Sequence, residues 1–283
     1  MQIHTSIESL RSALRNAGKV AFAPTMGNLH AGHISLMRQA QDHGDCVVSS
    51  IFVNRLQFGP REDFDKYPRT FDADCQQLHA AGVAHLFAPD ETVLYPTPQQ
   101  YFVLPAETQD SILEGAARPG HFRGVATVVT KLLNIVQPDT VLLGKKDYQQ
   151  LMVIRNMVRE LNMPIEVIGC DTVRAEDGLA LSSRNGYLSM NARAEAPRLF
   201  AQLQVVARAI QSGQTDFATL EAAASAHLYE HGWHPDYISV RRQADLLPPS
   251  PGDALVIVAA ARLENTRLLD NLEVSLELSP EVA

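Results

Sequence analysis

The sequence predicts an α/β protein in which a doubly wound parallel sheet is followed by a smaller α+β domain. In the first two thirds of the chain, short β-branched runs alternate with amphipathic segments, which is the pattern of βαβ units. After Arg174 two long Ala-rich helical stretches follow one another with no strand between them. This change of pattern predicts two domains, residues 1–175 and residues 176–283.

The predicted strands of the first domain are short apolar runs that suit a sheet covered on both faces. We expect them at 20–23, 46–53, 84–87, 140–143 and 165–168. The intervening helices are predicted near 30–43, 71–81, 122–136 and 147–161. In the helix that starts at Phe122, apolar residues recur at spacings of three and four, so one face is buried, and Pro138 ends that helix.

The second domain is predicted to begin with its helices and to end with its strands. The helices are expected at 193–211 and 217–231. The strands are expected near 237–240, 254–260 and 274–278. This order is typical of an α+β arrangement.

Composition excludes several classes of protein. The 283 residues include 24 Lys+Arg and 32 Asp+Glu, a net charge of −8, whereas a nucleic-acid scaffold usually has a basic stripe. The longest apolar run, 254–261, falls well short of the roughly 18 residues that a membrane span needs. The N-terminus lacks a basic stretch followed by an apolar core, so we expect a cytoplasmic protein. Three scattered cysteines predict neither disulfides nor a zinc cluster.

The strongest local signal for function is the segment 26–33, Met-Gly-Asn-Leu-His-Ala-Gly-His, between a predicted strand and a predicted helix. Ligands of open α/β sheets bind beyond the carboxyl ends of the strands, and a helix N-terminus attracts anions such as phosphate. Gly27 and Gly32 would let the backbone approach a ligand closely. His30 and His33 share one side of a helical turn and could donate to the same phosphate oxygens. A metal site or a simple helix cap is the alternative.

Basic and hydroxyl side chains form two further clusters. Gly144-Lys145-Lys146-Asp147 follows a later strand, where a lysine could bind phosphate and Asp147 could cap a helix or help to hold Mg²⁺. The segment 181–184, Leu-Ser-Ser-Arg, could wrap a polyphosphate. Each segment alone is also typical of an ordinary loop or turn.

Amide side chains follow the buried strand 46–53. Asn54 and Gln57 could bind hydroxyl groups or a carboxylate there. A further segment, Arg118-Pro-Gly-His-Phe-Arg-Gly124, concentrates positive charge at the start of a long helix. Taken singly, each of these segments is also consistent with a structural role.

In their order along the chain, these motifs resemble those of the pantoate–β-alanine ligases, a family of the HxGH nucleotidylyltransferase superfamily. The HxGH element alone marks only the superfamily, and the other motifs narrow the resemblance. The matching segments are Pro24–Gly27 with Leu29-His30 and Gly32-His33, Phe52–Asn54 with Gln57-Phe58, Tyr67–Thr70, Gly120–Gly124, Gly144 with Lys146-Asp147 and Gln149-Gln150, and Gly178–Asn185.

The resemblance implies a Rossmann-like first domain and a smaller C-terminal domain that covers the active site. It implies that ATP, with Mg²⁺ on its phosphates, activates pantoate as pantoyl adenylate with release of pyrophosphate. The amine of β-alanine then displaces AMP to give pantothenate. It also implies a homodimer that acts on small molecules, with no nucleic-acid partner, no membrane partner and no all-protein metal site.

The resemblance also assigns roles to individual residues. His33, His30 and Lys146 would be catalytic, with an electrostatic role favoured over proton donation for His33. Gln57, Gln150 and Asn54 would bind pantoate, and Gln57 would also lie near β-alanine. The residues expected to contact ATP are Met26, Gly27, Asn28, Leu29, His30, Ala31, Gly32, His33, Gly144, Lys145, Lys146, Asp147, Val173, Leu181, Ser182, Ser183 and Arg184.

Two positions depart from the family pattern. Arg55 stands where relatives have proline, which makes that loop less preset, and Leu181 replaces a methionine. Neither change removes a group that the mechanism needs. The alternatives are another adenylyl-transferring enzyme of the superfamily, which would not explain Gln57 or Gln150, and a non-catalytic nucleotide-binding protein.

Overall fold

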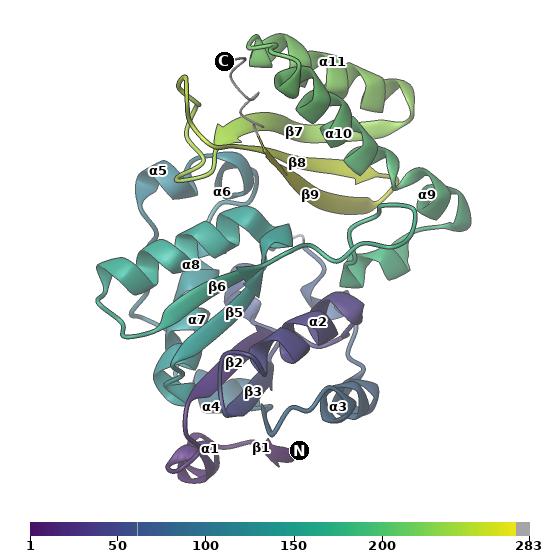
Figure 1. Ribbon diagram of the computed structural model, residues 1–283. Helices are drawn as coiled ribbons and strands as arrows, with labels where there is room; N and C mark the ends of the chain where they lie inside the picture. The colour runs from purple at the N-terminus through teal and green to yellow at the C-terminus, as the bar shows by residue number, and fades with distance from the viewer. Residues whose placement is uncertain (61, 276–283) are drawn as a thin grey trace. The chain divides into compact units, whose positions relative to one another are not determined.

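The structure is a computed structural model that describes residues 1–60 and 62–275 (Figure 1). The chain divides into two compact units. The first contains Met1–Lys145 and Gln150–Val173, and the second contains Lys146–Gln149 and the chain from Arg174 onward. The unit boundary thus lies near Arg174, and a short segment after Lys145 belongs with the C-terminal part of the chain.

The first unit is built on a six-stranded sheet in which all paired strands are parallel. The strand order is β1-β4-β3-β2-β5-β6. The strands are β1 (Gln2–His4), β2 (Val20–Thr25), β3 (Cys46–Ile51), β4 (His85–Phe87), β5 (Thr140–Gly144) and β6 (Glu166–Cys170). The doubly wound parallel sheet predicted from the sequence is confirmed.

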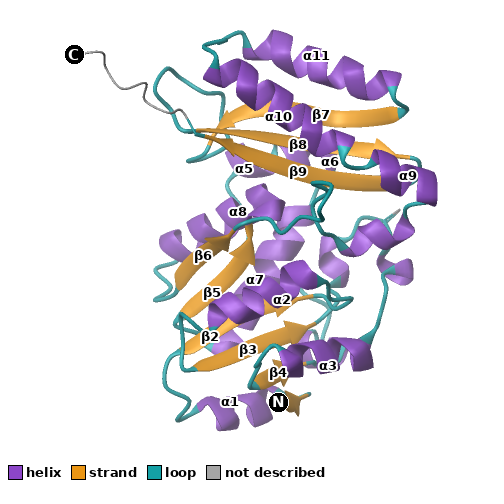
Figure 2. Cartoon of the chain, turned by 45° about the vertical axis from the view of Figure 1, so that its right-hand side comes forward, coloured by secondary structure: helices purple, strands orange, loops and turns teal. Residues whose placement is uncertain are grey.

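Helices cover both faces of this sheet (Figure 2). Helices α2 and α3 contact each other, and helices α1 and α7 contact each other. The helices are α1 (Ile7–Leu14), α2 (Ala31–Ala40), α3 (Phe71–Ala80), α4 (Glu91–Leu94), α5 (Glu107–Asp110), α6 (Leu113–Ala117), α7 (His121–Val136) and α8 (Tyr148–Glu160). Side chains of α2 and α3, including Met37 and Leu78, pack in one buried cluster with Ala21, Val47 and Leu86 of the sheet.

The direction of winding reverses between β2 and β5. The chain proceeds from β2 to β3 and β4 on one side, and from β5 to β6 on the other. The pairing of β2 with β5 ends at Phe22 and Val141. Pro24, which has no N–H to donate, lies in β2 beyond this last pair. Ligands of such sheets bind at this point of reversal, so the segments that follow β2 and β5 flank the expected site.

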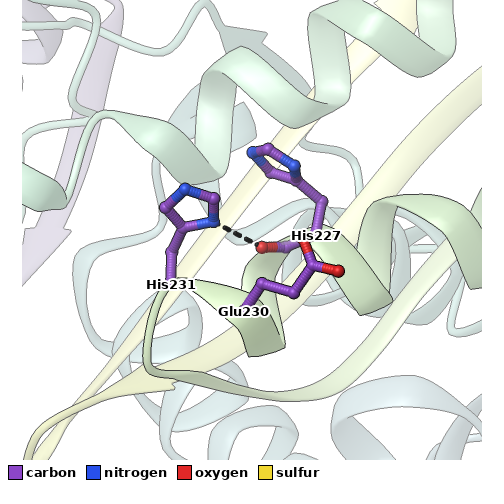
Figure 3. Close-up of side chains that lie close together, drawn as sticks. All are labelled: His227, Glu230 and His231. Carbon is purple, nitrogen blue, oxygen red and sulfur yellow. Dashed lines mark hydrogen bonds between the residues drawn. The ribbon is translucent and has the colours of Figure 1, made fainter.

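The second unit is a three-stranded antiparallel sheet with its own helices. The sheet has the order β7-β8-β9, with β7 (Trp233–Arg242), β8 (Leu255–Leu263) and β9 (Thr266–Val274). The helices are α9 (Met190–Glu195), α10 (Arg198–Gln211) and α11 (Phe217–Glu230). At the end of α11, His231 Nδ1 lies 2.8 Å from the carbonyl oxygen of His227 (Figure 3).

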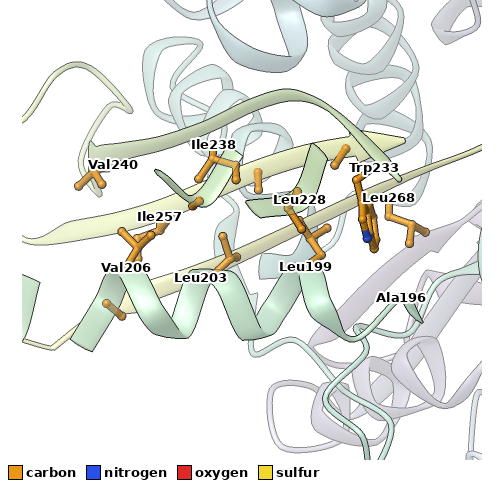
Figure 4. Close-up of a cluster of buried hydrophobic side chains, with 14 of the residues drawn as sticks. Ala196, Leu199, Leu203, Val206, Leu228, Trp233, Ile238, Val240, Ile257 and Leu268 are labelled. Atoms are coloured by element: carbon orange, nitrogen blue, oxygen red, sulfur yellow. The ribbon is translucent and has the colours of Figure 1, made fainter. Parts of the chain in front are cut away.

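Leu199 and Leu203 of α10, Leu228 of α11 and Ile257 of β8 form the core of this unit together with Trp233 (Figure 4). The Trp233 ring is fully buried, and its Nε1–H donates to Glu195 at 3.1 Å. This hydrogen bond gives the indole N–H an acceptor, which the N–H group of a buried tryptophan usually finds.

The sequence-based prediction of individual elements was wrong at two places in the second unit. The helix expected over 193–211 is two helices, because Pro197 stands at the N-cap of α10 and donates no N–H. The last strand covers Thr266–Val274 instead of 274–278, of which residues 276–278 lie outside the described chain. A tight turn at Glu264, where φ is 49°, joins it to β8.

In the first unit each predicted strand and helix is present, with ends that differ by at most three residues. The prediction missed β1, α1 and the short helices α4, α5 and α6. Ser6 caps α1 by accepting a hydrogen bond from the Ser9 N–H at 3.2 Å. Within residues 1–60 and 62–275, no helix combines the length and the apolar character needed to cross a membrane.

The close approach of α7 to the 3₁₀ turn η1 (Arg55–Gln57) depends on Gly124. A Cβ atom at Gly124 would lie 2.2 Å from the Leu56 carbonyl oxygen and 2.6 Å from the Gln57 nitrogen. Such distances are far below contact distance, so the backbone would have to move. In contrast, a Cβ atom at Gly144 would have nothing within 4 Å.

We expect Gly124→Ala to lower the free energy of unfolding of the first unit by about 3 kcal/mol, because the added methyl overpacks two backbone segments. Hydrogen exchange of the α7 amides measures this loss. Gly144→Ala is the matched control and should change the stability by less than about 0.5 kcal/mol. Equal stability of the two variants would contradict the packing argument.

Candidate active site

The turn from β2 into α2 uses two consecutive residues with left-handed backbone. Gly27 has φ 80° and Asn28 has φ 49°. The Gly27 N–H donates to Thr25 Oγ1 at 3.2 Å, and Thr25 Oγ1 in turn donates to the Ser50 carbonyl of the neighbouring strand at 2.7 Å. The turn is thereby attached to β3.

Asp74, on α3, accepts the next two backbone N–H groups of this turn. Its Oδ2 accepts from Asn28 at 2.9 Å, and its Oδ1 accepts from Leu29 at 2.8 Å. The Thr70 hydroxyl donates to the same carboxylate at 3.1 Å. The sequence analysis did not identify Asp74. The only signal in its favour is that it is one of two acidic residues in the first turn of α3.

The two histidines of the HxGH motif cap α2 reciprocally. His30 Nδ1 accepts from the Gly32 N–H at 3.1 Å, and His33 Nδ1 accepts from the His30 N–H at 3.3 Å. The rings lie 4.1 Å apart. Because each Nδ1 accepts a hydrogen bond, a neutral ring carries its proton on Nε2, which makes Nε2 a donor on each ring.

These contacts correct one expectation from the sequence. The backbone N–H groups of the turn were expected to be available to an anion. Instead, the N–H groups of Gly27, Asn28, Leu29, His30 and Gly32 all have acceptors within the protein. The helix-cap interpretation of the histidines is therefore correct for their Nδ1 atoms, and Nε2–H is the donor that each ring can offer to a ligand.

Gln57 lies beside the turn that follows β2, because its side chain contacts Met26. Gln57 Nε2 donates to Met26 Sδ at 3.2 Å, and Gln57 Oε1 accepts from Asn54 Nδ2 at 3.0 Å. Asn54 is buried; it also donates to the Gly124 carbonyl at 3.2 Å and accepts from the Tyr95 hydroxyl at 2.8 Å. Burial raises the pKa of Tyr95, so its hydroxyl keeps the proton that it donates.

A charged network holds the main chain at Gln57. The Gln57 carbonyl oxygen lies 2.9 Å from His121 Nδ1 and 3.3 Å from Arg118 Nη2. Arg118 also binds the carboxylate of Glu62 through Nε at 2.7 Å and Nη2 at 2.6 Å. Arg118, at the start of the positive segment before α7, therefore helps to hold the Gln57 main chain, and Glu62 compensates its charge.

The protonation states of this network follow from its geometry. Arg118 can only donate, so His121 Nε2, which lies 3.0 Å from Arg118 Nη1, accepts, and His121 Nδ1 carries the proton. Burial, followed by the charge of Arg118, lowers the pKa of His121 to about 4. Burial alone would raise the pKa of Glu62, but the hydrogen bond and charge of Arg118 lower it to about 2.

The Lys146–Gln149 segment is held by β9 within the second unit. Asn271 Nδ2 donates to the Lys146 carbonyl at 2.9 Å, and the Tyr148 hydroxyl donates to Glu273 Oε1 at 2.8 Å. Lys146 Nζ lies 3.4 Å from Asp147 Oδ1. Asn271 and Glu273 were not identified from the sequence, because only tertiary structure brings them to this segment.

The serine-rich segment forms the 3₁₀ helix η4 (Ser183–Tyr187) in the second unit. Ser182 caps it by accepting from the Arg184 N–H at 3.3 Å. Asn185 Nδ2 donates to the Ala180 carbonyl at 3.0 Å. Ser182, Ser183 and Arg184 are all half-buried, so their side chains are partly open to solvent.

The remaining predicted residues are dispersed. Val173 and Leu181 are half-buried, as is Gln150 on α8, and Ala31 is exposed. Lys145 Nζ forms a 2.9 Å ion pair with Asp171. In the first unit the structure thus brings Met26–His33 together with Gln57 and Asn54, whereas Lys146, Asp147 and Ser182–Arg184 belong to the second unit.

Arg55, the departure from the family pattern, points toward acidic and aromatic neighbours. Its guanidinium lies 4.0 Å from the centre of the Phe64 ring. Asp65 and Glu91 carboxylate oxygens are each 3.9 Å away. Stacking on Phe64 therefore restrains this side chain.

Two other features of the second unit do not contain predicted site residues. His227, Glu230 and His231 bring potential metal ligands together, but His231 Nδ1 caps the helix and His227 Nε2 lies 3.3 Å from Arg198 (Figure 3). A cavity of about 500 Å³ is lined by residues that include Asp177 and Phe200. Neither feature belongs to the candidate active site.

The pKa of His121 gives a direct test of the network around Gln57. We expect the ring to stay neutral, with its proton on Nδ1, down to about pH 4, as measured by NMR of ¹⁵N-labelled histidine. The unfolded chain takes up this proton near pH 6.5, so stability falls by about 3 kcal/mol as the pH drops from 6.5 to 4.

Arg118→Met is the control variant for this titration, and it should raise the pKa of His121 because a neighbouring positive charge is removed. Protonation of His121 above pH 6 in the unmodified protein would contradict the assignment.

Comparison with known proteins agrees with the geometry. The sequence model of the family described as Pantoate-beta-alanine ligase matches residues 2–273. Two crystal structures from Thermus thermophilus, one of pantothenate synthetase and one described as pantoate-beta-alanine (pantothenate synthetase), each show 44% identity and a TM-score of 0.92. Each match covers 97% of this chain and 99% of the other.

A third structure is that of a pantoate-beta-alanine ligase from Francisella tularensis, complexed with beta-gamma ATP and beta-alanine. It shows 36% identity and a TM-score of 0.82, over 96% of this chain and 97% of the other. The family match includes the capped HxGH turn, the amide pair after β3 and the segment held by β9. The chain therefore belongs to the pantoate–β-alanine ligase family and is a ligase.

Proposed function

We propose that the protein condenses (R)-pantoate with β-alanine to form pantothenate, through an enzyme-bound pantoyl adenylate, with AMP and pyrophosphate as the other products. The observation that carries this proposal is the contact between Gln57 and Met26. In this contact, an amide suited to a carboxylate or hydroxyl lies beside a turn suited to a nucleotide. The first step has to bring a carboxylate and a nucleotide together in this way.

In the first step a pantoate carboxylate oxygen attacks the α-phosphorus of ATP. The bond from that phosphorus to the bridging oxygen breaks, and pyrophosphate leaves. His30 and His33 would donate from Nε2 to the α-phosphate oxygens, where negative charge has to be stabilised. Their Nδ1 contacts to the backbone support this role, since they fix both the tautomer and the ring orientation.

Cationic and hydroxyl side chains would bind the remaining phosphate oxygens. Lys146 supplies a point charge on a main chain held by Asn271. Ser182, Ser183 and Arg184 supply further donors. ATP would enter as its magnesium complex, in which the phosphates and water provide most of the ligands.

Gln57 and Gln150 would orient pantoate, with Asn54 keeping the Gln57 amide in place. In the second step the neutral amine of β-alanine attacks the acyl carbon of the adenylate, the acyl–oxygen bond to AMP breaks, and the amine loses a proton. The Francisella ligase, whose complex contains beta-alanine, supports this choice of amine. The C-terminal domain as a cover, the homodimer and the cytoplasmic location stay predictions.

Pyrophosphate release tests the proposed pathway directly. With MgATP and pantoate alone, we expect one pyrophosphate per active site in a burst, because the adenylate stays bound. Steady turnover should begin only when β-alanine is added. If ATP binds but pantoate elicits no pyrophosphate, the substrate assignment is wrong.

Removing the imidazole of His33 or the ammonium group of Lys146 should slow the pyrophosphate burst. His33→Ala and Lys146→Ala are each expected to lower its rate about 100-fold, because each removes a donor to a developing phosphate charge. The exposed residues His43 and Lys19 provide the controls, since His43→Ala and Lys19→Ala remove the same side chains elsewhere. An unchanged burst in His33→Ala would exclude that residue from the mechanism.

A further inference from the structure

The turn that carries the HxGH histidines adopts a conformation that most residues avoid. Asn28 has φ 49° directly after Gly27 at φ 80°. A left-handed conformation is costly for a residue with a side chain and persists where surrounding contacts impose it. The N–H groups of Asn28 and Leu29 both donate to one carboxylate, that of Asp74.

Asp74 is built into the protein interior. Only 1% of its surface is exposed. Its two oxygens receive separate backbone N–H donors at 2.9 and 2.8 Å, and the Thr70 hydroxyl donates to both. A buried carboxylate with this set of donors orients the groups that contact it, because moving either N–H would leave a charged oxygen unsatisfied.

We infer that Asp74 is a positioning residue for adenylate formation. It holds the turn at Asn28 and Leu29, the turn places His30 at the N-cap of α2, and the reciprocal cap places His33. Loss of the carboxylate would let the turn relax and would displace the Nε2–H donors from the α-phosphate. This inference rests on the proposed function.

The effect should fall mainly on the nucleotide side of the reaction. Gln57, which would bind pantoate, donates to Met26 beside the turn. Gln57 and its partner Asn54 are otherwise held by Gly124, Tyr95 and His121, none of which hydrogen-bonds to Asp74 within residues 1–60 and 62–275. A loss of positioning at the turn should therefore lower the rate of adenylate formation and leave the KM for pantoate nearly unchanged.

Asp74→Asn is the test variant because it keeps the shape and replaces one acceptor oxygen by an NH₂ group that cannot accept from a backbone N–H. Asp72→Asn is the matched control, since Asp72 is exposed in the same first helical turn and loses the same charge. We expect Asp74→Asn to slow the pyrophosphate burst about 10-fold or more, with the KM for pantoate within about 3-fold of its original value. Asp72→Asn should change neither.

Hydrogen exchange provides a readout that does not depend on the reaction. The amides of Asn28 and Leu29 should be protected in the unmodified protein and should exchange faster in Asp74→Asn, but not in Asp72→Asn. If Asp74→Asn does not fold, Thr70→Val removes a single donor to the carboxylate and should give smaller changes in the same direction, with Thr70→Ser restoring them.

The two proposals fail in different ways. If the unmodified protein releases no pyrophosphate, the proposed function is wrong, and exchange at Asn28 and Leu29 still tests the contacts of Asp74. If the burst is normal in the unmodified protein and equally fast in Asp74→Asn, the positioning role is overturned. Unprotected amides at both positions in the unmodified protein would also overturn it.

Discussion

Satisfaction of backbone N–H groups at the end of β2 is the constraint on which the site depends. The turn into α2 needs acceptors, and Thr25, Asp74 and the two histidine rings provide them. Because the protein uses these five donors itself, side-chain donors become more important for a ligand. The two imidazole groups present Nε2–H donors, and their tautomer is set by the helix that they cap.

The segment that carries Gln57 is organised by the same principle with charged groups. Arg118 binds the Gln57 carbonyl, and Glu62 compensates the charge of Arg118. His121 stays neutral between them and contributes its Nδ1–H. The segment after β3 therefore has a fixed main chain without an uncompensated charge.

The sequence was sufficient for the parallel sheet, because strands buried on both faces are continuous apolar runs that stand out from amphipathic helices. It was insufficient where a single residue separates two helices, as Pro197 does before α10, or where a strand is as short as β1. Around the candidate site, the sequence singled out motif residues such as His33 and Gln57, whereas it gave no sign of Asp74, Tyr95 and Asn271. Their contacts join distant parts of the chain, and neither periodicity nor spacing encodes such pairs.

Trp233 has a consequence for the spectroscopy of this protein. It is the single tryptophan of the chain, and its buried indole donates to Glu195 within the second unit. Intrinsic tryptophan emission is therefore a probe of that unit alone. A denaturation curve recorded by fluorescence would follow loss of the β7–β9 core, whereas far-ultraviolet circular dichroism would average over both units. Non-coincident curves from the two methods would thus separate the unfolding of the two units without any labelling.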